Sequence, residues 1–127
     1  MAVKSILIVD DSVSNLKLST FLLRQEGFEV TTAENAQEAL ARLAKHIPGL
    51  ILMDIQLPGM DGLELTRRLR QDDSLRDVSI VAFTASAIKG DEEIAQAAGC
   101  HGYITKPIDT RSFGSVVRGY FDRQPLQ

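Results

Sequence analysis

The sequence is poor in cysteine and has no tryptophan, and its single thiol, Cys100, restricts the ways in which the fold can be stabilised. One cysteine cannot form an internal disulfide, and no set of cysteines and histidines has the spacing of a zinc site. A lone cysteine of this kind is usually a small buried side chain rather than a reactive thiol. We therefore expect a protein stabilised by its core alone, in a reducing cytoplasm.

Long apolar runs and an excess of positive charge are also absent. No run approaches the ~20 apolar residues that span a bilayer, and residues 1–4 lead into a strand-like segment without the pattern of a secretory signal. The net charge is −3, from 14 basic and 17 acidic residues, and the basic residues do not cluster. These features argue against membrane insertion and against direct binding of nucleic acid.

What the chain does have is enough apolar material for one core. It contains 127 residues, of which 44% are hydrophobic and 24% charged, close to the average of a globular domain. We therefore expect one domain over residues 1–127, with only a loose tail at residues 123–127.

Apolar runs alternate with helical patterns five times along the chain. The expected strands contain residues 6–9, 28–32, 50–53, 80–83 and 103–104. Helical stripes follow them: Leu18, Phe21 and Leu22; then Ala36, Ala39, Leu40, Leu43, Ala44 and Ile47; Leu65 and Leu69; a weaker set at Ile94, Ala97 and Ala98; and finally Phe113, Val116, Val117, Tyr120 and Phe121. Strands separated by helices predict an α/β fold, a three-layer, doubly wound sandwich around a parallel sheet.

Reactive side chains stand where four of these strands end. Asp10 and Asp11 follow the first strand, Asp54 the third, Thr84 the fourth, and Lys106 the fifth. Ligands of open parallel sheets bind beyond the carboxyl ends of the strands, so these residues should meet at one edge.

Three neighbouring carboxylates repel one another by several kcal/mol at an effective dielectric of ~20, and therefore need a cation. Oxygen ligands without cysteine or histidine favour Mg²⁺, which also accepts phosphate oxygens. An aspartate can act as a nucleophile and form an aspartyl-phosphate. The pattern predicts Asp54 in that role, with Lys106 neutralising phosphoryl oxygens and Thr84 donating a hydrogen bond to one of them.

This set of residues resembles the receiver domain of two-component response regulators. The resemblance extends over essentially the whole chain and rests on the residues Asp10, Asp11, Asp54, Pro58, Gly62, Thr84, Ala85, Lys106 and Pro107. Residues 51–58, 89–93 and 103–104 are most similar to a stand-alone, single-domain member. The resemblance implies a flavodoxin-like (βα)5 fold with a five-stranded sheet in the order 2-1-3-4-5.

The resemblance also implies a role for each matching residue. Asp54 would be the phosphoacceptor, and Mg²⁺ would be held by the Asp11 and Asp54 carboxylates and the Gln56 backbone carbonyl, with Asp10 acting partly through water. The peptide joining Lys106 to Pro107 would be cis. Further roles are a switch formed by Thr84 and Tyr103 and two positions that tune the phosphoryl lifetime, Gln56 and Ser86.

Simpler interpretations of single residues remain. Paired aspartates often begin a helix, and Asp54 alone could be a turn residue. Lys106 could be a solvated lysine, Thr84 could only end its strand, and Tyr103 could be plain core. His46 and His101 have no partners at ligand spacing and are expected at the surface.

The expected function is that of a single-domain response regulator. It would take a phosphoryl group from a phosphohistidine of a sensor histidine kinase or a histidine phosphotransfer protein. It would then act on a downstream protein through the face of its fourth helix, fifth strand and fifth helix, as a monomer or weak dimer. It would not be an enzyme beyond self-phosphorylation and self-dephosphorylation.

The alternatives are a receiver excised from a hybrid histidine kinase, a small Mg²⁺-dependent aspartyl-phosphate phosphatase and a flavodoxin-like FMN carrier. The phosphatase is disfavoured because the nucleophile follows the third strand and no segment could form a cap. The FMN carrier is disfavoured because the aspartate pair would repel a phosphate.

Overall fold

The structure is a computed structural model that describes residues 4–55, 57, 59, 61–84, 91–106 and 109–122. Strands and helices alternate along the described chain, with one short 3-10 helix, η1, before the fourth strand. The elements are β1 (Ser5–Val9), α1 (Val13–Gln25), β2 (Glu29–Ala33), α2 (Ala36–Lys45), β3 (Leu50–Asp54), α3 (Gly62–Arg70), η1 (Asp73–Leu75), β4 (Ser79–Thr84), α4 (Asp91–Ala98), β5 (Gly102–Thr105) and α5 (Phe113–Asp122).

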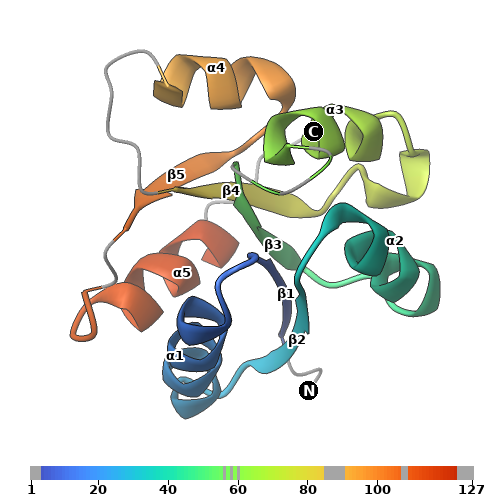
Figure 1. Cartoon of the computed structure of the whole chain (residues 1–127). Helices are drawn as coiled ribbons and strands as arrows, with labels where there is room; N and C mark the ends of the chain where they lie inside the picture. The colour runs from blue at the N-terminus through green and yellow to red at the C-terminus, as the bar shows by residue number, and fades with distance from the viewer. Residues whose placement is uncertain are drawn as a thin grey trace.

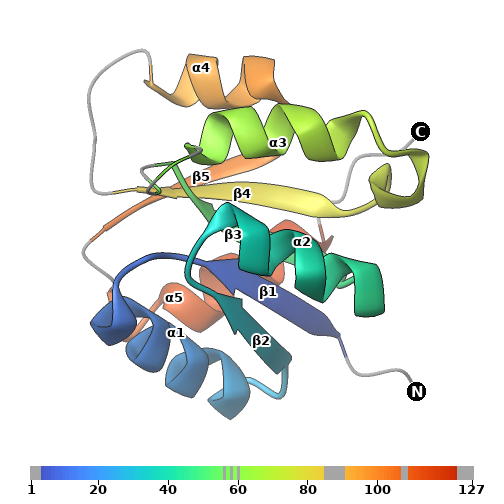
Figure 2. The same cartoon turned by 45° about the vertical axis from the view of Figure 1, so that its right-hand side comes forward.

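The strands form one parallel sheet in the order β2-β1-β3-β4-β5, which confirms the predicted fold. Helices α1 and α5 cover one face of the sheet, and α2, α3 and α4 cover the other (Figures 1 and 2). The central strands β1, β3 and β4 are aliphatic and almost wholly buried because helices cover both their faces. The edge strand β2 is more exposed, with Glu29 and Thr31 at the surface and Val30 and Ala33 buried.

Two hydrophobic clusters fill the spaces on either side of the sheet. One joins the sheet to α2, α3 and α4 and includes Leu65 and Cys100, while the other joins it to α1 and α5 and includes Leu23 and Phe121. Phe121 stacks on Phe28 with ring centroids 5.3 Å apart. Cys100 is a buried free thiol, and burial raises its pKa. The expectation of a small buried cysteine is confirmed.

The predicted buried face of α1 is wrong at two of its three residues. Leu18 and Phe21 are 37% and 58% exposed, whereas Leu22 packs partly buried against the core and the helix buries Leu16, Ser19 and Leu23. The buried stripe passes through a serine, so the positions of the large apolar side chains do not mark the buried face of this helix. The buried Ser19 hydroxyl has no hydrogen-bond partner among the described residues.

Smaller corrections apply to the other helices. In α2 the stripe is confirmed at Ala36, Ala39 and Leu43, and Leu40 is partly buried. Ala44 is exposed, and Ile47 lies beyond the end of the helix and is 44% exposed. In α4 the buried residues are Ala95 and Ala98, and the predicted Ile94 is 48% exposed, with Ala97 exposed beside it. In α5 the stripe holds at Phe113, Val117 and Phe121, while Val116 is 37% exposed and Tyr120 is half-buried.

The corrected face of α1 gives a stability prediction. Leu23 is 0% exposed, so Leu23→Ala should lower the unfolding free energy by about 2–5 kcal/mol through the lost contacts and the cavity left behind. Phe21→Ala should change it by about 0.5 kcal/mol or less, since surface substitutions rarely do more. Urea denaturation measures both, and an equal loss in the two variants would contradict the assignment of the buried face.

Candidate functional site

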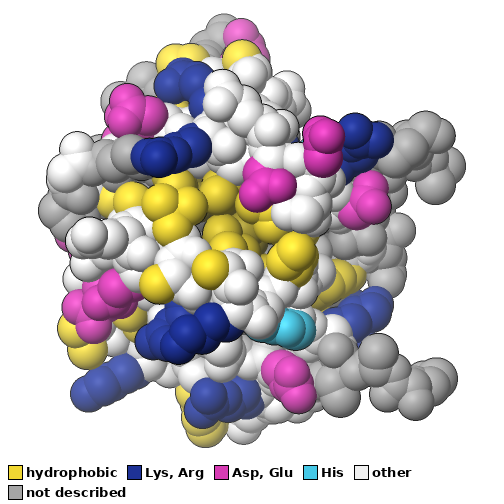
Figure 3. All heavy atoms as spheres, turned by 90° about the vertical axis from the view of Figure 1, so that its right-hand side faces the viewer, with side chains coloured by type: hydrophobic (Ala, Val, Ile, Leu, Met, Phe, Trp, Pro, Cys, Tyr) yellow, Lys and Arg dark blue, Asp and Glu magenta, His cyan; other side chains and the backbone are white. Residues whose placement is uncertain are grey.

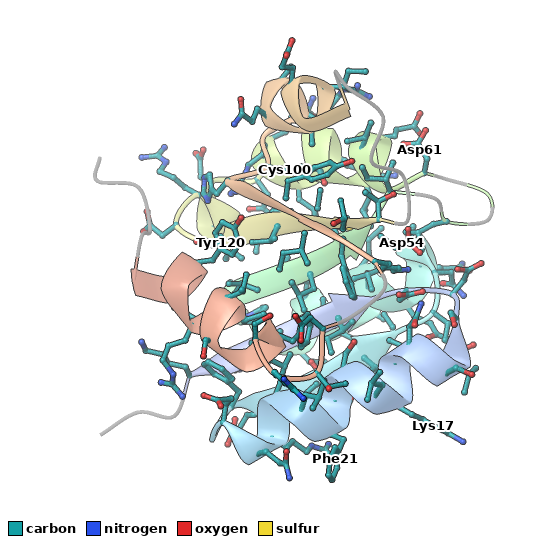
Figure 4. All side chains as sticks on the ribbon, turned by 90° about the vertical axis from the view of Figure 1, so that its left-hand side faces the viewer. Lys17, Phe21, Asp54, Asp61, Cys100 and Tyr120 are labelled. Carbon is teal, nitrogen blue, oxygen red and sulfur yellow. The ribbon has the colours of Figure 1, made fainter. Side chains whose placement is uncertain are left out.

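Asp54 lies at the carboxyl end of β3, in the middle of the sheet (Figure 4). Its neighbours are fixed by strand register: Met53 pairs with Val9 of β1, and Asp54 pairs with Phe83 of β4. Asp10 follows β1 directly, and its backbone N–H donates to the Ala33 carbonyl at 3.0 Å. The sheet therefore brings the ends of β1 and β3 together, as the sequence predicted.

Lys106 joins the two buried carboxylates. Its Nζ lies 2.8 Å from Asp10 Oδ2 and 3.2 Å from Asp54 Oδ2. Its side chain is 13% exposed, against 0% and 7% for the two aspartates. Burial disfavours the charged ammonium, but the contacts with Asp10 and Asp54 outweigh that penalty and raise the pKa of Lys106 above its ordinary value. Lys106 is therefore a permanently charged part of the site and not a solvated surface lysine.

The aspartates form a cluster that fits a divalent cation. Asp10, Asp11 and Asp54 each offer a carboxylate oxygen, and these oxygens lie within 4.8 Å of one another. Asp10 Oδ1 accepts a hydrogen bond from the Ser12 N–H at 2.9 Å. The buried Oδ2 of Asp10 forms an ion pair with Lys106, and no group among the described residues donates a well-aligned hydrogen bond to it. Asp11 is exposed and gives the cluster an open side. An all-oxygen set of this kind suits Mg²⁺.

An aromatic pair beneath Lys106 connects the site to α5. Lys106 Nζ lies 5.1 Å from the centroid of the Phe83 ring, and Phe83 stacks on Phe113 with centroids 5.6 Å apart. A cation over an aromatic face is attracted by the ring quadrupole. The ammonium is therefore held by two carboxylates and one ring, which restricts its position.

Gly62 allows α3 to approach Asp54 closely, whereas in the sequence this glycine indicated only a loop. It is the first residue of α3, and its N–H donates to the Ile55 carbonyl at 2.7 Å. A Cβ at this position would collide with the Asp54 carbonyl. The close approach of the helix to the end of β3 therefore requires a glycine.

Thr84 and Tyr103 lie on the neighbouring strands. Thr84 ends β4 and is 1% exposed, and its carbonyl accepts from the Lys106 N–H at 2.7 Å. Tyr103 lies in β5, packs partly buried against the α2–α4 side of the core, and its carbonyl accepts from the Tyr120 hydroxyl at 3.2 Å. The Tyr120 ring lies so close to Gly102 that a Cβ there would collide with it. This contact ties α5 to β5, and the sequence analysis missed it.

Three predicted positions lie outside the described residues. They are the Gln56 carbonyl, Ser86, and Pro107 with the peptide that joins it to Lys106. Their roles stay predictions, as does the loose tail at residues 123–127.

A family profile described as the response regulator receiver domain matches residues 6–118. The chain belongs to this family. The receiver is 45% identical over 117 residues to the polar-differentiation response regulator DivK of Brucella anthropi, a match covering 92% of this chain and 95% of the relative. The corresponding protein of Brucella ovis is 44% identical, and this match also covers 92% of this chain and 95% of the relative. The sequence resemblance to a receiver, and within it to a single-domain regulator of the DivK type, is confirmed.

Solved structures agree with the fold of the receiver. A response regulator from Chloroflexus aurantiacus superposes with a TM-score of 0.89 at 30% identity and covers 96% of this chain and 100% of its own. A CheY-like receiver domain protein from Methanospirillum hungatei gives 0.87 at 32% identity, with 97% of each chain covered. None of the helices in the described part of the receiver has both the length and the apolar composition of a membrane-spanning helix.

The two histidines of the receiver differ in their surroundings. His46 is exposed, and its Nε2 atom forms a hydrogen bond with the Ser5 hydroxyl at 3.1 Å. His101 is also at the surface, as predicted, but its ring lies against the Arg70 guanidinium, with Nε2 and Nη2 3.2 Å apart, and partial burial followed by the charge of Arg70 lowers the pKa of His101. Arg70 also donates to the Gly99 and Leu75 carbonyls at 2.9 and 3.1 Å, so this contact links α3 to the start of β5.

The lowered pKa predicts a pH dependence of stability. As pH falls below the ordinary value of about 6.5, the unfolded chain protonates His101 before the folded chain does, so the unfolding free energy falls until the lower folded pKa is passed. His101→Gln should therefore flatten this slope as pH falls through and below about 6.5. Urea denaturation across that range measures it, with His46→Gln as the matched control. Equal slopes in wild type and His101→Gln would contradict the prediction.

Proposed function

We propose that this receiver accepts a phosphoryl group on Asp54 from a phosphohistidine of a sensor histidine kinase or a histidine phosphotransfer protein. The observation that carries the proposal is the position of Lys106, 3.2 Å from Asp54 and 2.8 Å from Asp10, beside three clustered carboxylates. One buried cation near a nucleophilic carboxylate serves a reaction that brings further negative charge to it. Because phosphohistidine is made from ATP, the reaction belongs in the cytoplasm.

The proposed transfer needs little covalent chemistry from the protein. An Asp54 carboxylate oxygen attacks phosphorus, the bond from phosphorus to the donor imidazole breaks, and the imidazole nitrogen takes a proton. Asp10, Asp11 and Asp54, with the Gln56 carbonyl, would hold Mg²⁺, which supplies positive charge for the phosphoryl oxygens. The Lys106 ammonium neutralises another of these oxygens, and the Thr84 hydroxyl donates a hydrogen bond.

The consequence of phosphorylation would be a changed surface on α4, β5 and α5. A phosphoryl group adds roughly −1.5 to −2 charges at pH 7, beside Thr84 and Lys106. Thr84 would move toward the phosphoryl group and Tyr103 would turn inward, which biases a pre-existing equilibrium between two packings. The partly buried Tyr103 and the exposed Ile94 on this face support the proposal. The phosphorylated face would then bind a downstream protein.

We further propose that the protein is a phosphoacceptor and not an enzyme that turns over substrates. The nucleophile ends β3, and the partly buried Lys106 is held between Asp54 and Asp10. Gln56 and Ser86 would then set how long the phosphoryl group lasts.

Incubation with Mg²⁺ and phosphoramidate, whose phosphorus–nitrogen bond is like that of phosphohistidine, tests the proposal. We expect one hydroxylamine-labile phosphoryl group per chain by intact mass spectrometry, lost in Asp54→Asn. The matched control is Asp61→Asn, which changes an exposed aspartate at the start of α3 while keeping a side chain able to cap the helix. Phosphorylation that persists in Asp54→Asn contradicts the assignment, and release of many phosphates per chain would favour a phosphatase.

A further inference from the structure

A groove runs along the free edge of the sheet, between α1 and β2. It has a volume of about 900 Å³, and we call it the α1–β2 groove; its principal lining residues are Val13, Lys17, Phe21, Arg24, Thr32 and Arg42. Val13 and Phe21 are 51% and 58% exposed, so two large apolar side chains face solvent on one flank of α1. Lys17 and Phe21 project from the side of α1 that faces away from the sheet (Figure 4). The lining of the groove shares no residue with the cluster of Asp10, Asp11 and Asp54.

Arginines from both layers hold the strand that forms the floor of this groove. The Glu29 N–H and the Ala33 carbonyl bond toward β1, so alternation along the strand turns the backbone groups of Val30 and Thr32 to the free edge. Arg24 of α1 donates to the Val30 carbonyl at 3.4 Å, and Arg42 of α2 donates to the Thr32 carbonyl at 3.2 Å. These contacts place two exposed guanidinium groups on the rim.

Arg24 and Arg42 have further N–H groups, not used in these contacts with β2, that can donate hydrogen bonds to a ligand. A guanidinium has five N–H donors, and the contacts with β2 use Nη2 of Arg24 and Nε of Arg42. A group already held in place loses less conformational freedom when it binds a carboxylate. The rim is thus arranged to receive carboxylates without releasing the edge strand.

The charge of the groove indicates its occupant. Its lining includes Lys17, Arg24 and Arg42 against one acidic residue, Glu34, in a protein of net charge −3. A symmetric contact between two copies would place the same basic side chains opposite each other, which is repulsive. An acidic partner would find complementary charge along the rim and the apolar surface of Phe21 in the middle.

We propose that the α1–β2 groove binds an acidic segment of another protein, with an apolar side chain packed on Phe21 and Val13 and carboxylates on Arg24, Arg42 and Lys17. This binding needs no phosphoryl group on Asp54. It would give the receiver a second contact that stays available when the phosphorylation-dependent face changes.

The probe is a short acetylated peptide in which aspartate and glutamate residues alternate with phenylalanine and leucine, titrated into the unphosphorylated protein and followed by ¹H–¹⁵N NMR. Shifts should concentrate in α1, in β2 and at the Arg24 and Arg42 side chains. The double variant Arg24→Glu/Arg42→Glu should bind at least about tenfold more weakly. The matched control is Arg67→Glu/Arg68→Glu, which reverses two exposed arginines of α3.

Two altered peptides complete the test, one with lysines replacing the acidic residues and one with serines replacing the apolar residues. Both should bind more weakly than the acidic probe, as should the Phe21→Ser variant, which remains informative if the double variant does not fold. Shifts elsewhere, equal weakening by the α3 control, tighter binding of the lysine peptide, or no binding at millimolar peptide would overturn the proposal. Dimerisation through α1 and β2, seen by sedimentation equilibrium, would make a second copy the occupant and overturn it as well.

Discussion

Lys106→Met is expected to lower the unfolding free energy by about 3–5 kcal/mol in metal-free buffer. The ammonium is the cation that offsets two buried carboxylates, at 2.8 Å from Asp10 and 3.2 Å from Asp54. Methionine keeps most of the apolar stem but leaves Asp10 and Asp54 facing each other without compensation. Urea denaturation with a chelator present measures the loss, and Lys17→Met, which removes an exposed lysine from α1, is the matched control.

The same variant should respond more strongly to Mg²⁺ than the wild type does. Removing Lys106 makes the potential around Asp10, Asp11 and Asp54 more negative, so a divalent cation should bind more tightly and recover part of the lost stability. The increase in unfolding free energy between chelator and saturating Mg²⁺ is therefore expected to be larger in Lys106→Met than in wild type. An equal or smaller increase would show that Lys106 and the metal do not share these carboxylates.

Gly62→Ala is expected to damage both stability and phosphorylation. The added Cβ would collide with the Asp54 carbonyl, and main-chain atoms can yield only if α3 or the end of β3 moves. Overpacking of this kind costs about 1–3 kcal/mol, and a displacement of Asp54 by about 1 Å would slow phosphoryl transfer by up to about a hundredfold. Urea denaturation and the rate of labelling by phosphoramidate measure the two effects.

Gly27→Ala is the matched control for Gly62→Ala, because the added Cβ at position 27 strains the backbone without colliding with a neighbour. Gly27 follows α1 with φ +96°, and nothing lies within 4 Å of a Cβ added there. Alanine at this position should cost roughly 1–2 kcal/mol of left-handed strain and leave the phosphorylation rate unchanged. If Gly62→Ala also labels at the wild-type rate, the close approach of α3 does not position Asp54.

The order of elements and the meeting of the strand ends followed from the sequence because they depend on local patterns. Aliphatic runs such as residues 50–53 are buried on both faces. The parallel arrangement of the strands then brings Asp10, Asp54, Thr84 and Lys106 together at the carboxyl ends of the strands. The face of α1 was predicted correctly only at Leu22, because Ser19 occupies a buried position and Phe21 an exposed one. Periodicity identifies the helix, but its neighbours decide which flank is covered.

Which side-chain atoms pair with each other where the strand ends meet could not be predicted from the sequence. The ion pair of Lys106 with Asp10 joins β5 to β1, and the Tyr120 hydroxyl on the Tyr103 backbone joins α5 to β5. Each depends on side-chain direction after the sheet has formed. Gly62 was visible only as a loop signal, since its need for a missing Cβ arises from the position of the Asp54 carbonyl.

The central claim is that Asp54, and no other carboxylate of the cluster, becomes phosphorylated. Borohydride reduces an acyl phosphate and converts the acceptor aspartate to homoserine, which peptide mass spectrometry then locates. After incubation with Mg²⁺ and phosphoramidate, we expect homoserine at position 54 and none when Mg²⁺ is chelated. Homoserine at position 10 or 11 instead, or no conversion with Mg²⁺ present, would contradict the account.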